Sequence, residues 1–421
     1  MLKCISVDRL ELGMWIEELR GSWTDHPFWR DSFFLDNRED LERILASEVR
    51  EVWIDTGKGL DVPAEGRAAD DGDAMARDLP QPASSHKLPP PPPSRSRPSE
   101  PIHAELQRAA QICAEAKDTV LSMFQEARMG HAVDTRNAHQ LVEQISQSIN
   151  RNASALISMA RLKKADDYTY MHSVAVCALM IALARQLGLD DRQTEAAGMA
   201  GLLHDVGKAK IPKEVLDKPG KLTEHEFAIM REHPAQGYDI LREMRNLPPE
   251  ALDVVLHHHE KMNGTGYPHG LKGEEISLYA KMGAVCDVYD AITSNRPYKN
   301  GWDPAESLHK MAEWAGGHFD QRVFQAFVKS VGIYPIGSLL RLNANNAGTP
   351  SGVMLGIVVD QSEQALTKPI IRAFYSVERD RRIPPQTFNL ASADCPVRIV
   401  SRENPEQWNF PNLEKLWLEA A

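Results

Sequence analysis

Histidine is concentrated in one apolar part of the chain. Eight of the 15 histidines fall within the 98 residues from His172 to His269, where about three or four would fall by chance. Within this window the run VAVCALMIALA, Val174–Ala184, is apolar on every side. A helix of that kind is buried, and imidazole or carboxylate groups beside it are costly unless they are paired or bind a metal. The sequence therefore predicts a helical core built around a polar cluster.

Three of these histidines stand at predicted helix ends. His172 opens the apolar helix, and His204 with Asp205 ends the next helix in the run LLHDVGK. A metal can use both members of such a pair, because consecutive helix positions point about 100° apart. His233 precedes Pro234, where a helix is expected to break. Taken alone, His172 is more often a hydrogen-bonded core histidine than a ligand, the His204–Asp205 pair is a weak signal, and His233 is compatible with a simple helix terminus.

Two longer motifs add more imidazoles, carboxylates and cations. The run LHHHEKMNGTGYP places three consecutive histidines at a predicted helix end, before a tight glycine turn. Its competing interpretation is an accidental surface run of histidines. The run CDVYDAITSNRPYK places Asp287 and Asp290 three residues apart, and hence on one helix face. Arg296 and Lys299 follow in the next loop.

Together these segments supply about five imidazoles and two carboxylates, more than one tetrahedral zinc needs. Mixed ligation of this kind suits two iron or manganese ions that share a bridging carboxylate. Paired metals activate a hydroxide for in-line attack at phosphorus, and Lys208, Arg296 and Lys299 supply positive charge for phosphate oxygens. His225 and His269 lack such neighbours in the sequence and are interpreted as ordinary surface residues.

The motifs HDVGK, HHEKMNGTGYP and DVYDAITSNRPYK, in this order, resemble the signature series of the HD-GYP family, a branch of the HD phosphohydrolases. The resemblance spans about residues 165–335. It implies a phosphodiesterase that hydrolyses the bacterial messenger cyclic di-GMP to linear pGpG, to GMP or to both at a metal centre. The runs LELGMWIEEL and SWTDHPF resemble a small domain that often precedes this module in bacteria.

Carried over residue by residue, the resemblance implies the ligands of a two- or three-metal centre. The family pattern places two histidines just before a glutamate, here Glu260, which leaves His257 out. Asp205 bridges the metals and, with Lys208, is the expected catalytic pair. The implied metal ligands are His172, His204, Asp205, His233, His258, His259 and Asp287. The implied substrate-binding residues are Lys208, Tyr267, Asp290, Arg296 and Lys299, of which Asp290 would also orient a ligand.

Two positions depart from the family pattern. Asn263 stands where the family has Asp before the Gly-x-Gly-Tyr-Pro turn, and the lost charge bears on turn geometry or substrate binding. Tyr168 stands one turn before His172, where members with a third metal carry Glu. A phenol is a poor ligand for divalent iron or manganese. The chain is therefore expected to hold two divalent ions.

Two other functions stay open on the sequence alone. Asn263 leaves room for a catalytically weak cyclic di-GMP sensor that acts through protein partners. A generic HD-type nucleotide phosphohydrolase with one metal would not need the histidines at 233, 258 and 259. Counting metals and assaying turnover separate these alternatives from the phosphodiesterase.

A proline-rich stretch divides the chain. Residues 63–101 hold 10 of the 27 prolines and predict a semi-rigid linker, with a proline-rich recognition motif as the alternative. We expect a small α/β domain over 1–62, a helical connector over 102–165, the catalytic domain over 166–335 and a β-rich extension over 336–421. The predicted fold class is mainly α, with a helical HD-type phosphohydrolase core between the two smaller parts.

Local patterns support this division. The runs KCISV and REVWID predict strands and NREDLERILAS a helix in the first domain, whereas GSLLRL, GVMLGIVV and PIIRAFYSV predict strands in the last. In the connector, apolar residues recur every four positions and share one helix face: Leu141, Ile145, Ile149, Ala153 and Ile157. That face suits a homodimer contact, signal transmission to a partner or packing on the next domain, and the sequence leaves these alternatives open.

Charge and composition exclude several classes of protein. A net charge of −11 disfavours nonspecific binding to nucleic acid or anionic membrane. The longest apolar run has 11 residues, short of the roughly 20 that span a bilayer. The N-terminus is charged too early for a secretory signal, and the five cysteines are scattered. We therefore expect a cytoplasmic protein whose ligand is a small nucleotide rather than a nucleic acid polymer or a membrane.

Overall fold

The computed structural model describes most of the chain in segments separated by gaps. It divides into two compact units, Met1–Pro92 and Pro93–Ala421. The predicted linker and the SWTDHPF run lie outside the described residues. Those residues are 2–20, 33–45, 50–60, 102–132, 135–162, 168–244, 246–294, 301–344, 352–362, 365–408, 410 and 412–418.

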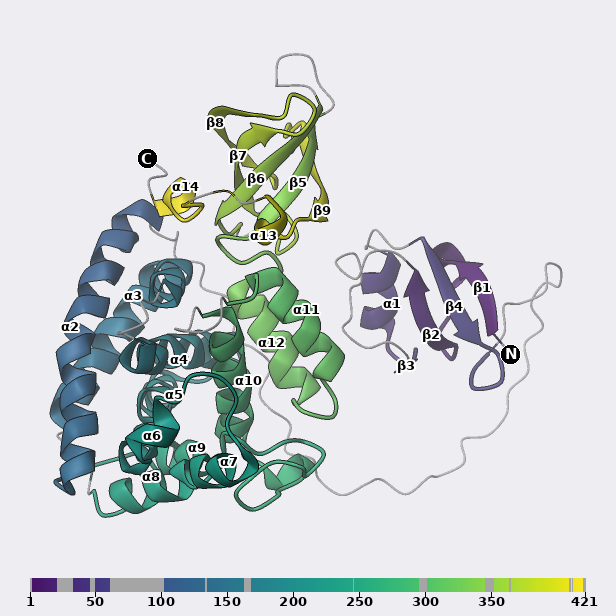
Figure 1. The fold of residues 1–421 in the computed structure, drawn as a ribbon. Coiled ribbons are helices and arrows are strands. Elements are labelled where there is room, and N and C mark those ends of the chain that lie inside the picture. Colours follow the sequence, from purple (N-terminus) through teal and green to yellow (C-terminus); the bar gives the residue numbers. More distant parts are fainter. Residues whose placement is uncertain are drawn as a thin grey trace. The chain divides into compact units, whose positions relative to one another are not determined.

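The N-terminal unit is a small antiparallel sheet with one helix (Figure 1). Its strands lie in the order β1-β4-β2-β3, and the expected strands KCISV and REVWID form β1 and β4. The core comprises apolar side chains from the strands, from α1 and from the short helix η1, among them Ile5, Ile16, Ile44 and Ile54. The bounds are β1 Leu2–Ser6, η1 Val7–Arg9, β2 Trp15–Arg20, β3 Phe33–Phe34, α1 Arg38–Leu45 and β4 Glu51–Asp55.

Two long helices, α2 (Ile102–Met129) and α3 (Thr135–Arg161), form the connector and pack along each other (Figure 1). Leu141, Ile145 and Ile149 are buried, as the four-residue spacing predicts. The spacing fails beyond Asn152, whose extended backbone (φ −157°, ψ 104°) interrupts α3. The interruption turns the helix, so that Ala155 and Leu156 are buried while the expected Ala153 and Ile157 are only half-buried.

The helical core surrounds α4 (Tyr168–Gln186), whose residues 170–184 are all buried. The helix ends before Gly188, which has the positive φ of 77° that ends many helices. Helices α3, α5, α10 and α12 pack against α4. The other elements of this core are α5 Asp191–Leu203, η3 Val206–Lys210, α6 Lys213–Leu216, α7 Glu224–Met230, α8 His233–Leu241, α9 Pro249–His257, η4 Gly273–Glu275, α10 Leu278–Thr293, α11 Pro304–Trp314 and α12 Gln321–Val331.

A five-stranded antiparallel sheet follows the core, in the order β8-β7-β6-β5-β9. The three predicted strands form β5, β6 and β7, whereas β8 and β9 were not predicted. Strand β8 contains Pro384 and Pro385, which are tolerated because the strand lies at an edge of the sheet. The two prolines also interrupt the alternation of apolar and polar residues by which a strand is predicted. The bounds are β5 Leu339–Ala344, β6 Gly352–Asp360, β7 Ile370–Ser376, β8 Arg381–Asn389, β9 Val397–Arg402, α13 Pro405–Trp408 and α14 Lys415–Leu418.

This arrangement is mainly α, with a helical core flanked in sequence by a small α/β unit and a β extension, as predicted. In the part of the chain that the structure describes, no helix combines the length and apolar content needed to cross a membrane.

Candidate metal centre

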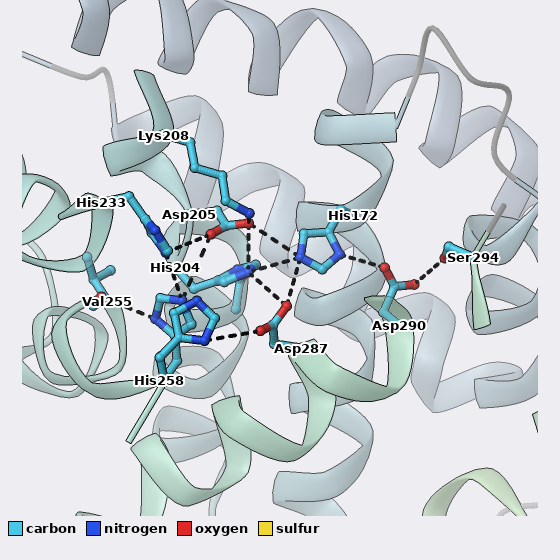
Figure 2. Close-up of polar contacts among 12 residues, drawn as sticks. His172, His204, Asp205, Lys208, His233, Val255, His258, Asp287, Asp290 and Ser294 are labelled. Atoms are coloured by element: carbon cyan, nitrogen blue, oxygen red, sulfur yellow. Dashed lines mark hydrogen bonds and ion pairs between the residues drawn. The ribbon is translucent and has the colours of Figure 1, made fainter. Parts of the chain in front are cut away.

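Seven polar side chains from five helices and their ends converge at one point of the helical core (Figure 2). Each comes from a place where a helix begins or ends, or from a buried helix face. The set consists of His172 on α4, His204 at the end of α5, Asp205 before η3, His233 at the start of α8, His258 and His259 after α9, and Asp287 on α10. The structure thus brings together every metal ligand that the sequence predicts.

Gly207 of the HDVGK motif makes this convergence possible. A Cβ added at this position would lie 1.9 Å from the carbonyl oxygen of His233 and 2.5 Å from the backbone nitrogen of Gly237. Only glycine lets the backbone of η3 approach α8 so closely. The motif glycine therefore brings Asp205 within reach of the imidazole of His233.

The nitrogen and oxygen donors form two groups on either side of Asp205. One group is His172, His204 and Asp287, and the other is His233, His258 and His259. Oδ2 of Asp205 lies 3.3 Å from Nε2 of His204, whereas Oδ1 lies 3.3 Å from Nε2 of His233. Each carboxylate oxygen thus faces a different group, which is the arrangement of a ligand that bridges two metal ions.

Hydrogen bonds fix which imidazole nitrogens carry protons in three of the histidines. The Nδ1 atoms of His204, His233 and His258 lie 2.8, 2.7 and 2.9 Å from the carbonyl oxygens of Gly201, Met230 and Val254. A carbonyl only accepts, so each Nδ1 carries a proton, and in the neutral form of each ring Nε2 is bare.

The bare nitrogens face one another. Nε2 of His233 and Nε2 of His258 lie 3.3 Å apart, with no proton to share between them. Oδ1 of Asp205 is also buried and has no hydrogen-bond partner among the described residues. A cation between these lone pairs would compensate them, and imidazoles with an oriented Nδ1–H are typical metal ligands. The residues therefore fit bound divalent metal ions.

Burial and charge set the protonation states needed for metal binding. Burial lowers the pKa of His233 to about 4 and the pKa of His259 to about 3, in spite of nearby carboxylates. Both rings are thus neutral near pH 7. Burial alone would raise the pKa of Asp205, but His204 and Lys208 outweigh it and hold the pKa well below its usual range. The carboxylate of Asp205, which is predicted to bridge the metal ions, is therefore ionised.

His172 lies where the negative charge is most concentrated. Its Nε2 is 3.0 Å from Oδ1 of Asp287, and its Nδ1 is 2.6 Å from Oδ2 of Asp290. Burial lowers the pKa of His172, but Asp205, Asp287 and Asp290 raise it to about 10. Three carboxylates thus favour a positive charge at this ring, which a proton supplies in the metal-free chain. Asp290 is itself buried, accepts from the hydroxyl of Ser294 and contacts the imidazole of His172, a predicted metal ligand.

Of the predicted substrate contacts, Lys208 and Tyr267 lie at the rim of the centre, whereas Asp290 is buried against His172, where it can orient the imidazole. Nζ of Lys208 is 2.5 Å from Oδ2 of Asp205, and its side chain is 23% exposed. The ring of Tyr267 lies over His259, with centroids 4.7 Å apart. Arg296 and Lys299 lie outside the described residues, as does the side chain of Tyr168.

Arg231 is a rim residue that the sequence did not single out. Its Cζ lies 4.7 Å from the centroid of the Tyr267 ring, and the side chain is exposed. A stack of Arg231, Tyr267 and His259 therefore leads from the surface to the predicted metal ligands. In the sequence, Arg231 is marked only by its position two residues before His233. Such a neighbouring cation is too common to identify a residue of the site.

Glu260 anchors residues 263–271, here called the glycine loop because they contain Gly264, Gly266 and Gly270. In the sequence, Glu260 served only to mark the two preceding histidines. Its buried carboxylate accepts hydrogen bonds from the backbone N–H groups of His269, Gly270 and Leu271, at 2.7, 3.0 and 3.0 Å. A carboxylate held by successive backbone amides is a strong, charge-assisted contact. Glu260 therefore fixes the segment that follows Tyr267.

Asn263 performs a turn role that an aspartate would also perform. Its Oδ1 accepts from the backbone N–H of Thr265 at 3.0 Å and from the Thr265 hydroxyl at 2.7 Å. This side-chain turn needs an acceptor oxygen, not a charge. The replacement of the usual Asp by Asn263 therefore preserves the turn geometry.

Comparison with known proteins identifies the family of the chain. The HD domain family matches residues 143–323, and a domain of unknown function matches residues 2–138. A cyclic di-GMP phosphodiesterase of Pseudomonas aeruginosa is 50% identical over 422 residues, covering 100% of this chain and 97% of that protein. A cyclic di-GMP phosphodiesterase response regulator of Xanthomonas campestris is 36% identical over 220 residues, covering 48% of this chain and 57% of that protein.

Among solved structures, an HDG"Y"P protein from Bdellovibrio bacteriovorus aligns with a TM-score of 0.46 and 18% identity, covering 78% of this chain and 99% of that one. The assignment rests instead on the full-length sequence match and on the motif residues gathered around Asp205. The chain belongs to the HD-domain family of metal-dependent phosphohydrolases and, within it, to the HD-GYP branch.

Proposed function

We propose that this protein hydrolyses cyclic di-GMP to linear pGpG, to GMP or to both, using two divalent metal ions, iron or manganese. The observation that carries the proposal is the position of Asp205, whose two oxygens each face a separate group of ligands. Two ions so placed can act together on one phosphodiester. The full-length relative in Pseudomonas aeruginosa is named for this activity.

Each residue of the centre has a defined part in the proposal. Bound divalent ions would supply Lewis-acid charge and a nucleophile at neutral pH. Asp205 holds both ligand groups together, and Asp290 keeps the imidazole of His172 oriented. Lys208, next to Asp205 at the partly exposed rim, donates to a phosphate oxygen. Arg296 and Lys299 are proposed as further phosphate contacts on the basis of the family motif.

The test is turnover by the full-length chain after anaerobic loading with Fe²⁺ or Mn²⁺. We expect cyclic di-GMP to be consumed, with pGpG or GMP as the product. The cyclic dinucleotide 3′3′-cGAMP is the informative comparison, because a 3′3′-cGAMP-specific phosphodiesterase of Vibrio cholerae is 35% identical over 162 residues. Tight binding of cyclic di-GMP without turnover in fully loaded protein would contradict the proposal and identify a sensor.

Arg231 is expected to contribute to substrate binding through its place over Tyr267. Arg231→Ala should raise the KM for cyclic di-GMP roughly 10- to 100-fold, since a hydrogen bond to a charged group contributes about 1.5–3 kcal/mol. The metal content and kcat should stay close to wild type, because Arg231 contacts Tyr267 rather than a ligand. Steady-state kinetics with elemental analysis measure both.

The matched control for this change is Arg242→Ala, which removes an exposed arginine on the far end of the next helix, where it pairs with Asp239 at 3.2 Å. An unchanged KM in Arg231→Ala, or an equal rise in both variants, would remove Arg231 from the substrate site.

Glu260→Gln tests the anchor of the glycine loop. The amide replaces one acceptor oxygen by an NH₂ group, which repels the backbone N–H groups that Glu260 now binds. We expect kcat/KM for cyclic di-GMP to fall roughly 10-fold, which corresponds to about 1.4 kcal/mol, while metal content stays unchanged. Glu274→Gln, at a carboxylate that is 94% exposed, is the control. Wild-type kcat/KM in Glu260→Gln would contradict the anchoring role.

The cellular setting forms the remaining part of the proposal. Among the described residues, the cysteines at 113, 177, 286 and 395 form no disulfide, which suits a reducing cytoplasm. The connector helices α2 and α3 are the proposed route to a second copy of the chain or to a protein signalling partner.

A further inference from the structure

A second pair of histidines lies beside the centre but outside it. His257 is the last residue of α9, and His269 follows Pro268 in the glycine loop. Nε2 of His257 lies 3.0 Å from Nδ1 of His269, and the ring centroids are 5.2 Å apart. The side chain of His257 is 16% exposed, and His269 is exposed. The pair is therefore accessible from solvent.

A carboxylate orients this pair as carboxylates orient metal-binding histidines. Nδ1 of His257 lies 2.8 Å from Oδ1 of Asp253, and Oδ2 of Asp253 accepts from the hydroxyl of Ser277. A serine hydroxyl must donate to a carboxylate, so Asp253 is held as an acceptor and His257 gives it the Nδ1 proton. Nε2 of His257 is then a bare lone pair that points toward His269.

The metal centre contains the same arrangement. There, Asp290 accepts from Nδ1 of His172, while Nε2 of His172 lies 3.2 Å from Nε2 of His204. Two nitrogens bonded to one ion at about 2.1 Å each, roughly at right angles, are about 3.0 Å apart. The separation of 3.0 Å between His257 and His269 matches that value.

We propose that His257 and His269 form a peripheral site for a transition-metal ion that favours imidazole, such as Ni²⁺, Cu²⁺ or Zn²⁺. Water would complete the coordination, because the protein supplies only two nitrogen donors and His269 is exposed. The site is therefore weaker than the buried centre. The inference concerns metal binding alone and does not depend on which nucleotide the protein hydrolyses.

An ion at this site would join two segments that carry the catalytic machinery. The backbone N–H of His269 already binds Glu260, and Tyr267 lies two residues earlier. His257 precedes the ligands His258 and His259 directly. A bridging ion would thus connect the end of the glycine loop to the last turn of α9. The backbone amide hydrogens of residues 269–271 should then exchange more slowly with solvent when the ion is bound than when it is absent.

The experiment uses the full-length chain with its centre already loaded with Mn²⁺. Ni²⁺ is added in equilibrium dialysis, and Mn²⁺ and Ni²⁺ are both counted by elemental analysis, so that displacement at the centre is recognised. We expect one Ni²⁺ per chain to bind without loss of Mn²⁺ in the wild type. His269→Ala should lose that equivalent, whereas His225→Ala, which removes an exposed histidine on α7, should retain it.

Asp253→Asn supplies an independent variant that leaves both imidazoles in place. It should weaken the additional Ni²⁺ equivalent roughly 10- to 100-fold, the usual effect of removing a carboxylate that orients a metal-binding histidine. Wild-type protein that binds no Ni²⁺ beyond what displaces Mn²⁺ would overturn the proposal and leave a simple imidazole hydrogen bond. Equal Ni²⁺ binding in wild type and His269→Ala would overturn it as well.

Discussion

Asp205→Asn is expected to keep the fold and to lower the turnover of cyclic di-GMP at least about 10³-fold. The side chain is 2% exposed and lies between the two groups of ligands, with one oxygen toward each. Asparagine has nearly the same shape, but its NH₂ group cannot bind a metal ion and its charge is zero. The two ligand groups therefore lose the carboxylate that they share. Without its negative charge, the affinity for both metal ions falls.

The same change has a second consequence at the rim. Lys208 lies 2.5 Å from Oδ2 of Asp205 and would lose its ionic partner. Turnover, metal content and thermal unfolding of the variant together distinguish a lost centre from a lost fold. Asp239→Asn, at a 63% exposed carboxylate on α8, is the control and should behave as wild type. Near-wild-type turnover with full metal content in Asp205→Asn would refute the two-metal mechanism.

The helical core and its ligands were predictable because two signals coincide there. The all-apolar run of α4 required burial, and residues 170–184 are indeed buried. Polar groups at the ends of neighbouring helices then had to meet inside the core. The sequence alone did not decide which two of three adjacent histidines face inward. In the structure α9 ends at His257, and the following turn directs His258 and His259 into the cluster while His257 pairs with Asp253.

The features that escaped prediction depend on contacts between distant segments. Asn152 interrupts α3 through its backbone conformation, which no periodic pattern of apolar residues records. Glu260 binds amides nine to eleven residues later, and Arg231 acquires its place only because Tyr267 lies over His259. In each case the residue type is ordinary, and its role comes from a neighbour that the chain brings near by folding.

Removal of the metal ions should abolish turnover and destabilise the fold. The bare Nε2 atoms of His233 and His258 face each other at 3.3 Å, and Oδ1 of Asp205 has no hydrogen-bond partner among the described residues. These groups are desolvated in the native state and become compensated only when ions bind. Binding to the native state alone stabilises it by about 4 kcal/mol when free metal exceeds its Kd 1,000-fold. Unfolding of chelator-treated and reloaded protein, followed in parallel with turnover, measures both effects.

The reloaded protein should retain two ions of Fe²⁺ or Mn²⁺ per chain after gel filtration. The described donors include two groups of three that have no member in common, His172, His204 and Asp287 against His233, His258 and His259, and a third group, His204, Asp205 and His258, that lies between them. The pair His257–His269 offers only two imidazoles and should release Fe²⁺ or Mn²⁺ during filtration, because it is exposed and lacks a carboxylate ligand of its own. It therefore does not raise the count of tightly held ions.

His233→Ala makes the stoichiometry decisive. It removes one imidazole from the group of His258 and His259 and leaves His172, His204 and Asp287 complete. We expect this variant to hold close to one ion per chain and to lose turnover, while His225→Ala keeps two ions and full activity. Three tightly held ions in the wild type would instead require a further ligand near α4, and Tyr168→Phe with renewed metal counting would show whether the phenol supplies it.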